Sequence, residues 1–277
     1  MEDLPTMSQI MAKVPPEVRK KYQGMEKCTD RTQHECDTMN SVQGNLTGYD
    51  CHACLNRGNV YHVDDGYIVS HECDCMKIRR SIWNIKKSGI ESLMQHCTFE
   101  NFEARDEWQK DLKSGAQQFL TDHTGKWFYA GGQVGCGKTH ICTAACGELL
   151  KQGKAVRYML WRDEIVKLKA NANDSSEYQR LIYPLKTAPV LYVDDFFKTS
   201  DELDGSKKKP TQADTQAAFE ILNYRYINQD LITIISSERS IDNLLECDEA
   251  VGSRIYQRSK EYCFYFGADK KKNYRLR

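Results

Sequence analysis

The chain has 277 residues, of which 39 are basic and 39 acidic, so its formal net charge is zero. A neutral chain has no overall attraction for a polyanion, and any contact with nucleic acid has to come from local clusters. No apolar run approaches the roughly 18 residues needed to span a bilayer, and the acidic N-terminus, with Glu2 and Asp3, is not that of a secretory signal. These features predict a soluble, cytoplasmic protein without a membrane partner.

Two polar segments flank a cysteine-rich stretch. The first, residues 1–48, is expected to hold one short helix, at residues 17–22, and to be otherwise flexible. The second, residues 77–97, is predicted to be a basic linker helix, because isoleucines recur at helical spacing among lysines and arginines with no acid over residues 76–87. Such a face favours contact with phosphates, although a merely solvated helix has the same pattern.

The cysteine-rich stretch, residues 49–76, carries two pairs of closely spaced thiols. They are Cys51-x-x-Cys54 and Cys73-x-Cys75. Four thiolates in two short knuckles match the tetrahedral ligand set of Zn²⁺. The Asp65-Gly66 turn predicts a small β-ribbon between them, and a segment of this size needs the metal to fold. The alternatives are a redox pair, four unconnected thiols, or His52 or His71 in place of one sulfur.

From residue 98 onward, short apolar runs alternate with helical patterns. The strands are expected at residues 126–130, 155–160, 190–194, 231–236 and 262–267. The helices are expected at residues 140–151, 163–170, 176–186, 213–228 and 250–260. This alternation predicts a doubly wound α/β domain over residues 98–277, in which helices cover both faces of a parallel sheet.

A phosphate-binding loop follows the first of these strands. Residues 132–139 match the pattern of a glycine, four residues and Gly-Lys-Thr. Glycines let the backbone N–H groups point inward at a helix N-terminus, where they bind phosphate. Lys138 is expected to reach the outer phosphates of ATP, and the Thr139 hydroxyl to ligate Mg²⁺. The predicted nucleotide-binding residues are Gly132, Gln133, Val134, Gly135, Cys136, Gly137, Lys138 and Thr139.

Polar residues also end the later strands. The run at residues 190–193 leads into Asp194-Asp195, at the strand tip expected nearest the phosphate loop. Asp194 is expected to hold Mg²⁺, and Asp195 to polarise the attacking water. The strand at residues 231–236 leads into Ser236-Ser237-Glu238, where a polar side chain, taken as that of Ser237, is expected to sense the γ-phosphate. Together with the loop, these side chains predict an ATPase.

In this order, the pieces resemble the DnaC/DnaI family of replicative helicase loaders, in the form carried by phages and mobile elements. The likeness covers residues 49–277: the cysteine segment, Thr-Phe-Glu-Asn-Phe at 98–102, Gly-Ser-Arg-Ile at 252–255, and the stretches 132–140, 191–196, 218–226 and 234–237. The resemblance implies an AAA+-like P-loop module lacking a lid domain. It adds His140 to the nucleotide-binding residues and makes Arg254 an arginine finger that reaches the γ-phosphate of a neighbouring subunit.

The resemblance further implies an ATP-dependent loader. Its zinc module would dock on a hexameric replicative DNA helicase, while the ATPase domain would bind single-stranded DNA and self-associate. Asp195, where many AAA+ enzymes have glutamate, implies slow hydrolysis that DNA or the partner stimulates. Residues 207–209 and 270–277 are basic clusters that either contact DNA or only face solvent. The alternative functions are a transposase-helper ATPase of the IstB type and an adaptor that binds ATP without hydrolysing it.

Overall fold

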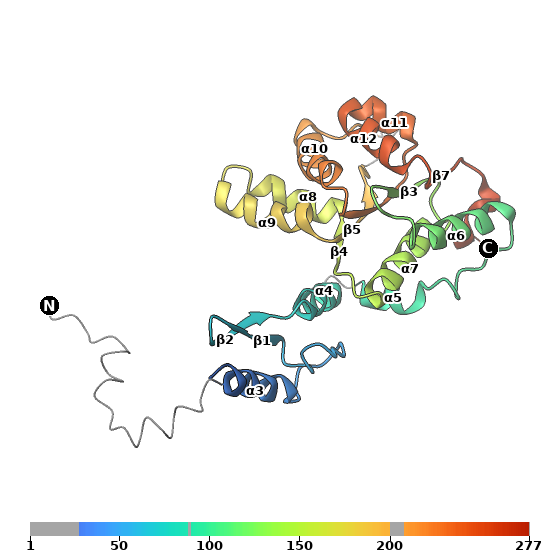
Figure 1. The fold of residues 1–277 in the computed structure, drawn as a ribbon. Coiled ribbons are helices and arrows are strands. Elements are labelled where there is room, and N and C mark those ends of the chain that lie inside the picture. The colour runs from blue at the N-terminus through green and yellow to red at the C-terminus, as the bar shows by residue number, and fades with distance from the viewer. Residues whose placement is uncertain (1–27, 88–89, 200–207, 277) are drawn as a thin grey trace, which may run out of the picture. The chain divides into compact units, whose positions relative to one another are not determined.

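The computed structural model describes residues 28–87, 90–199 and 208–276. The helix predicted at residues 17–22 and Lys207 of the basic cluster lie outside the described residues. The chain divides into two compact units between Met76 and Lys77. Figure 1 labels their helices and strands. None of the described helices combines the length and the hydrophobicity needed to cross a membrane.

The first unit contains one helix and a β-ribbon. Helix α3 (Cys28–Ser41) precedes the antiparallel strands β1 (Asn59–Asp64) and β2 (Tyr67–Glu72). The two strands are joined by Asp65-Gly66, whose φ angles are +46° and +81°. Two residues with positive φ make the turn whose twist matches a hairpin. The predicted β-ribbon is thus confirmed.

Helix α3 is not predicted by the sequence, because most of its side chains are polar and exposed. Two side-chain pairs one turn apart support it, Arg31 with Glu35 at 3.2 Å and Gln33 with Asp37 at 2.8 Å. The Asn40 amide then donates to the Tyr61 carbonyl at 2.7 Å and accepts from the Tyr61 N–H at 3.0 Å. The Asn40 side chain therefore bonds to the edge of β1 as the backbone of a neighbouring strand would. Such a contact leaves no periodic pattern in the sequence.

The second unit is built on one five-stranded sheet. Its strands, in the spatial order β4-β5-β6-β3-β7, are all parallel. They are β3 (Trp127–Gly132), β4 (Val156–Leu160), β5 (Val190–Phe196), β6 (Ile232–Ser237) and β7 (Cys263–Phe266). Each strand bound lies within two residues of its predicted position. The parallel sheet predicted from alternating strands and helices is thereby confirmed.

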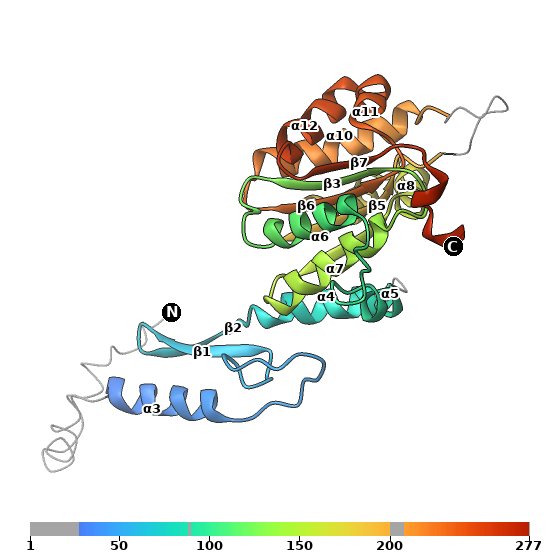
Figure 2. The same ribbon diagram turned by 90° about the vertical axis from the view of Figure 1, so that its right-hand side faces the viewer.

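Helices cover both faces of this sheet (Figure 2). On one face, α6 (Glu107–Phe119) and α7 (Lys138–Lys151) pack in a core with Phe128 and Ile234. On the other face, α8 (Trp161–Ala170), α9 (Ser175–Thr187), α10 (Gln212–Ile227) and α12 (Glu249–Ser259) pack with Tyr129 and Ile235. Adjacent residues of β3 and β6 thus enter different cores, because successive strand side chains point to opposite faces.

Two helices of the second unit were not predicted, α6 and the short α11 (Ile241–Cys247). Helix α6 carries a capping box between Asp106 and Gln109, and it buries Leu112, Ala116 and Phe119 at helical spacing. Both features are readable in the sequence. The acidic stretch at residues 246–249 forms the junction of α11 and α12.

Helix α4 (Cys75–Lys87) begins in the first unit and continues into the second, where α5 (Glu91–His96) follows. In the second unit, the Ser81 hydroxyl accepts from the Val156 N–H at 2.7 Å and also contacts the Val156 carbonyl. Ile85 and Ile90 join the core on the α7 face of the sheet. The end of α4 is therefore part of the second unit, and its isoleucine spacing reflects burial.

A buried arginine joins the last turn of α10 to α9 and β6. Arg225 is fully buried and has no carboxylate partner among the described side chains. Burial lowers the pKa of its guanidinium to about 9. Its donors are satisfied by the Thr233 hydroxyl and by the carbonyls of Leu185, Lys186, Ala188 and Ile232. Three of these carbonyls lie at or just past the C-terminal end of α9, where the helix dipole favours a cation.

Candidate functional site: a nucleotide pocket and a cysteine cluster

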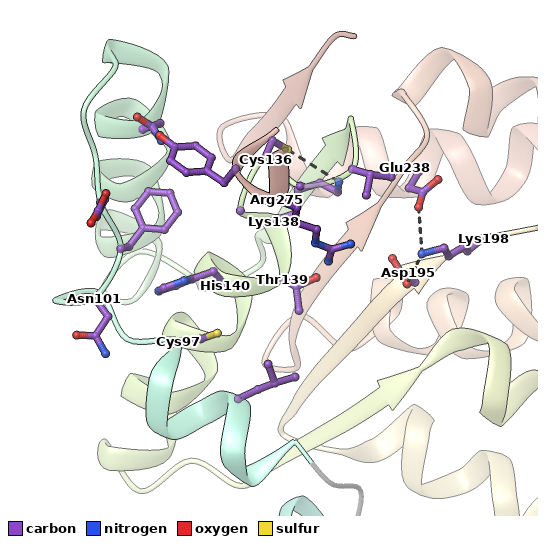
Figure 3. Close-up of a pocket in the computed structure, with 18 residues that line it drawn as sticks. Cys97, Asn101, Cys136, Lys138, Thr139, His140, Asp195, Lys198, Glu238 and Arg275 are labelled. Carbon is purple, nitrogen blue, oxygen red and sulfur yellow. Dashed lines mark hydrogen bonds and ion pairs between the residues drawn. The ribbon is translucent and has the colours of Figure 1, made fainter. Parts of the chain in front are cut away.

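A pocket of about 470 Å³ lies in the second unit (Figure 3). Its size is in the range of small-molecule sites, and it lies where chain segments leave the carboxyl ends of β3, β5 and β6. In doubly wound sheets ligands bind at this edge. The lining comes from Leu93 to Glu103 and Gln109, the loop Val134 to His140, Asp195 and Lys198 at the end of β5, Glu238 after β6, and Tyr274 with Arg275.

The loop between β3 and α7 has a backbone that only glycine fits. Gly132, Gly135 and Gly137 have φ angles of +109°, +79° and +92°. A Cβ atom would lie 2.1 Å from the Phe266 oxygen at Gly132 and 2.0 Å from the Asn273 side-chain oxygen at Gly135. Gly137 is the N-cap of α7, so the N–H groups of the first helical turn have no partner within the helix. This geometry suits an anion.

Lys138 lies inside this loop. Its Nζ donates to the carbonyls of Gly132 at 2.9 Å and Gln133 at 2.6 Å, and the residue is only 7% exposed. Burial lowers the pKa of Lys138, and the nearby Glu238 and Asp195 carboxylates oppose that change. A buried ammonium held by neutral carbonyls is incompletely compensated. A triphosphate would supply anionic acceptors at the same place, so the residues present fit the group.

Asp194 is held beside Thr139 by a set of hydroxyl groups. Its carboxylate accepts from Thr139 at 3.2 Å, from Tyr192 at 2.8 Å and from Tyr158 at 3.1 Å, and also from Ser236. Burial, followed by the charge of Asp194, raises the pKa of both tyrosines. The Thr139 hydroxyl and the Asp194 carboxylate are the hard oxygen ligands that Mg²⁺ prefers. Buried Tyr192 and half-buried Tyr158 are positioning groups that the sequence did not reveal.

Asp195 enters the pocket because β5 is irregular at this point. The pairing of β5 with β6 shifts between Val193 and Phe196, and Asp195 has a φ of +54°. A regular strand would point Asp194 and Asp195 to opposite faces, whereas a bulge redirects a side chain. Lys198 bridges the Asp195 carboxylate at 2.8 Å and that of Glu238 at 3.1 Å. Burial alone would lower the pKa of Lys198, but the two carboxylates raise it.

Ser237 does not face this pocket. Its hydroxyl is fully buried, donates to the Phe196 carbonyl at 2.7 Å and accepts from the Arg239 N–H at 3.1 Å. The polar side chain that lines the pocket after β6 is that of Glu238. Glu238 and Lys198 are thus pocket residues outside the predicted set, although Glu238 directly follows β6 and Lys198 lies two residues past β5.

His140 connects the phosphate loop to the segment before α6. Its Nε2 lies 2.8 Å from the Thr98 carbonyl, and its ring meets that of Phe102 edge-on at 5.2 Å between centroids. Phe102 also lies against Gly137, where a Cβ would approach its ring to 2.9 Å. The run at residues 98–102 is therefore part of the pocket wall and packs against the phosphate loop.

Arg254 lies on α12, outside the pocket of its own chain. Its Nε donates to the Asn223 side chain at 3.0 Å, and a terminal nitrogen to the Ala250 carbonyl at 2.7 Å. The guanidinium carbon is 4.8 Å from the centre of the Phe219 ring. Within the described chain Arg254 forms no ion pair with either acidic neighbour in the sequence, at positions 248 and 249. Asn223 and aromatic rings therefore orient this cation, instead of a surface salt bridge.

In the first unit, the four clustered cysteines come together. The sulfurs of Cys51 and Cys73 are 3.7 Å apart, those of Cys54 and Cys75 are 3.5 Å apart, and all four lie within 4.8 Å of one another. Tetrahedral Zn²⁺ with Zn–S bonds of about 2.3 Å separates its sulfurs by about 3.8 Å. The donor set and its spacing therefore fit zinc.

The surroundings favour a thiolate at Cys54, whereas burial raises the pKa of the neighbouring Cys73. Burial raises the pKa of the Cys54 thiol, but the Gly58 N–H at 3.3 Å and the neighbouring cysteines outweigh burial and bring it to about 6. His52 is exposed, and the His71 ring contacts that of His62 at 3.2 Å. Neither His52 nor His71 belongs to the group of potential ligands found among the described residues.

Comparison with known proteins places this chain in a family. The family model described as IstB-like ATP binding protein matches residues 65–275. Phage-like element PBSX protein XkdC of Bacillus subtilis (strain 168) is 30% identical over 245 residues, which cover 85% of this chain and 89% of that protein. Replicative helicase loader DnaC of Escherichia coli (strain K12) is 31% identical over 130 residues, 46% of this chain and 52% of that protein.

The fold has known counterparts as well. The crystal structure of the DnaI matches with a TM-score of 0.51 and 19% identity, over 64% of this chain and 92% of that one. This likeness shows a shared fold, the P-loop AAA+-like α/β class that the sequence predicts. Because the family model spans nearly all of the second unit, and the likeness to XkdC extends over most of both chains, this protein belongs to the IstB/DnaC-like family of P-loop ATP-binding proteins.

Proposed function

We propose that this protein is an ATP-dependent loader that recruits a hexameric replicative DNA helicase and helps to place it on single-stranded DNA. The observation that carries the proposal is the pocket around Lys138, with Thr139, Asp194 and Asp195 at the strand ends beside it. The relative named replicative helicase loader DnaC supports this choice among the functions of P-loop proteins.

In this proposal the nucleotide site works through groups already in place. Thr139 and Asp194 would hold Mg²⁺, which supplies charge neutralisation to the phosphates when bound. Lys138 would turn from the loop carbonyls to the outer phosphates. Asp195 would orient the attacking water once Lys198 no longer holds its carboxylate. Because that release has to precede hydrolysis, turnover would be slow in the protein alone and faster with DNA or a partner.

The cysteine cluster would bind one structural Zn²⁺ and shape the first unit as the docking module for the helicase. Four buried or half-buried sulfurs leave no ligand position open, which favours a structural over a catalytic metal. Bound zinc would give this small segment a fixed fold, and so a defined surface for a partner. The ATPase-like unit would then contact DNA and neighbouring copies.

Helicase loading can be tested directly. The host helicase, the full-length protein and ATP are mixed with circular single-stranded DNA, and helicase retained on the circle is measured. We expect retention to need this protein and ATP, and to disappear with Cys51→Ser. If the chain captures a transposase from host extract and no helicase, the IstB-like function is correct instead. ATP binding with no turnover, even with DNA and helicase present, indicates a non-hydrolysing adaptor.

Arg254 is expected to act on the ATP of a neighbouring copy, because it lies outside its own pocket and its guanidinium is held in a fixed orientation. A guanidinium in trans supplies on the order of 10³–10⁵ in rate to other phosphoryl-transfer sites. Arg254→Ala and Lys138→Ala are each expected to be inactive alone. Mixed, they should recover part of the ATPase activity, since an intact finger can serve an intact site.

The mixing experiment has a matched control. Arg258→Ala removes an arginine from the next turn of α12, whose guanidinium instead binds the carbonyls of Gly125 and Tyr226. This variant, once shown to be folded, should keep its turnover without any partner. If Arg254→Ala alone hydrolyses ATP at the wild-type rate, at a concentration where the wild type self-associates, the finger role is wrong.

A further inference from the structure

The segment after β7 packs on the phosphate loop. It contains two short 3-10 helices, η1 (Lys270–Lys272) and η2 (Tyr274–Leu276). The side chain of Gln133, in the loop, pairs with the Asp269 backbone: it donates to the carbonyl at 2.7 Å and accepts from the N–H. The Tyr274 N–H donates to the Gly135 carbonyl at 2.9 Å. Two points of the loop are thus tied to the C-terminal segment.

Further contacts hold this segment to the wall of the pocket. The Tyr274 hydroxyl accepts from the Gln109 side chain on α6. Gly135 has no Cβ at the point where one would meet the Asn273 side chain. The Lys272 ammonium lies 5.8 Å from the centre of the Trp108 ring. A conformational change in the phosphate loop would therefore alter its contacts with the segment from Asp269 to Tyr274.

Arg275 lies at the mouth of this pocket, beside Lys138 and Thr139 (Figure 3). The Asn273 side chain accepts from its N–H at 3.0 Å and so fixes the backbone from which it projects. The other pocket cations are engaged: Lys138 with loop carbonyls and Lys198 with two carboxylates. Arg275 is exposed and forms no ion pair with any residue that the structure describes.

We propose that the C-terminal segment is a built-in part of the nucleotide site and that Arg275 binds the outermost phosphate of ATP bound to the same chain. A guanidinium matches phosphate oxygens with two parallel hydrogen bonds. Neighbouring Lys138 and Thr139 mark the end of the pocket where the outer phosphates would lie. The proposal rests on the ATP site proposed above and is independent of helicase loading.

This assignment also changes the role of the basic tail. The sequence offers residues 270–277 as a cluster for DNA, or as a solvated surface. Contacts of Asp269 and Tyr274 with the loop place the segment against the nucleotide pocket instead. Bound ATP would therefore fix the C-terminal segment from both sides, through the loop and through Arg275, whereas ADP would fix it through the loop alone.

The test is equilibrium binding of ATP and ADP, with Mg²⁺, to full-length wild type, Arg275→Ala and Arg275→Lys. Removing one charge-assisted contact to phosphate corresponds to about a 10- to 100-fold loss of affinity. We expect Arg275→Ala to lose about that much for ATP and less than about 3-fold for ADP, and Arg275→Lys to recover part of the loss. A merely structural role would weaken both nucleotides equally.

The matched control is Lys271→Ala, which removes the same charge from the same segment but does not line the pocket. It should bind both nucleotides as the wild type does. Equal losses for ATP and ADP with Arg275→Ala, or the same loss with Lys271→Ala, would overturn the proposal. If the wild type itself binds no ATP, the ATP site proposed above fails, which is a separate result. Because Arg275 is exposed, unchanged thermal unfolding is expected to show that Arg275→Ala is folded.

Discussion

The Lys138→Ala variant is expected to lose ATP binding, with an affinity about 100-fold or more below that of the wild type. Lys138 is the buried ammonium of the phosphate loop, and no other described cation lies inside that loop. Contacts between charged groups contribute about 1.5–3 kcal/mol each, and a lysine that reaches two phosphates makes more than one. The loss should appear in a direct titration with labelled nucleotide, without any need for turnover.

Asp195→Asn is the matched comparison. Its side chain also lines the pocket, but it is proposed to act on water and not on phosphate. This variant should bind ATP within a few-fold of the wild type and fail to hydrolyse it. Thermal unfolding checks that Lys138→Ala is folded, since the change also leaves the Gly132 and Gln133 carbonyls without their donor. Equal ATP affinity in the wild type and in folded Lys138→Ala would end the case for this site.

The second large effect concerns zinc. Cys51→Ser and Cys73→Ser are each expected to lose the metal and to unfold residues 49–76, while ATP binding stays nearly intact. Structural zinc contributes about 10–16 kcal/mol of apparent binding free energy to small domains, far more than a short β-ribbon can replace. The four sulfurs and the ribbon lie in the first unit, whereas the nucleotide pocket lies in the second.

Metal analysis of the purified protein should find one Zn²⁺ per chain and none in either variant. Limited proteolysis reports the unfolding of residues 49–76, and nucleotide titration reports the second unit. Cys247→Ser is a suitable control, because Cys247 is half-buried at the end of α11 and distant in sequence from the cluster. Absence of zinc from the wild type, or metal retained in both cysteine variants, would contradict the prediction.

The sequence alone determined the class of fold and the positions of most elements. Short β-rich runs and helical periods are local signals, so the five strands of the sheet could be placed to within two residues. The phosphate loop is also a local signal, because its glycines adopt positive φ angles that other residues avoid. The spacing of the cysteines likewise predicted that their sulfurs could meet.

The helices that were not predicted differ in the kind of signal they carry. Helix α3 is held by polar pairs and by Asn40, which bonds to the edge of β1 twenty-one residues away in sequence. Helix α6 carried a capping box and an apolar face that were not used. Helix α3 depends on a distant contact and α6 on a local signal, so of these two helices α3 lay beyond what the sequence could show.

The site itself was decided by tertiary structure. The left-handed backbone of Asp195 brings its carboxylate into the pocket. Asp194 is oriented by the hydroxyl of Tyr192 on its own strand and by those of Tyr158 on β4 and Ser236 on β6. Folding also turned Ser237 into the interior. The packing of the C-terminal segment on the phosphate loop joins residues more than a hundred positions apart. Contacts of this kind arise only when distant segments meet, because no local propensity determines which side chain a buried carboxylate or a loop carbonyl will face.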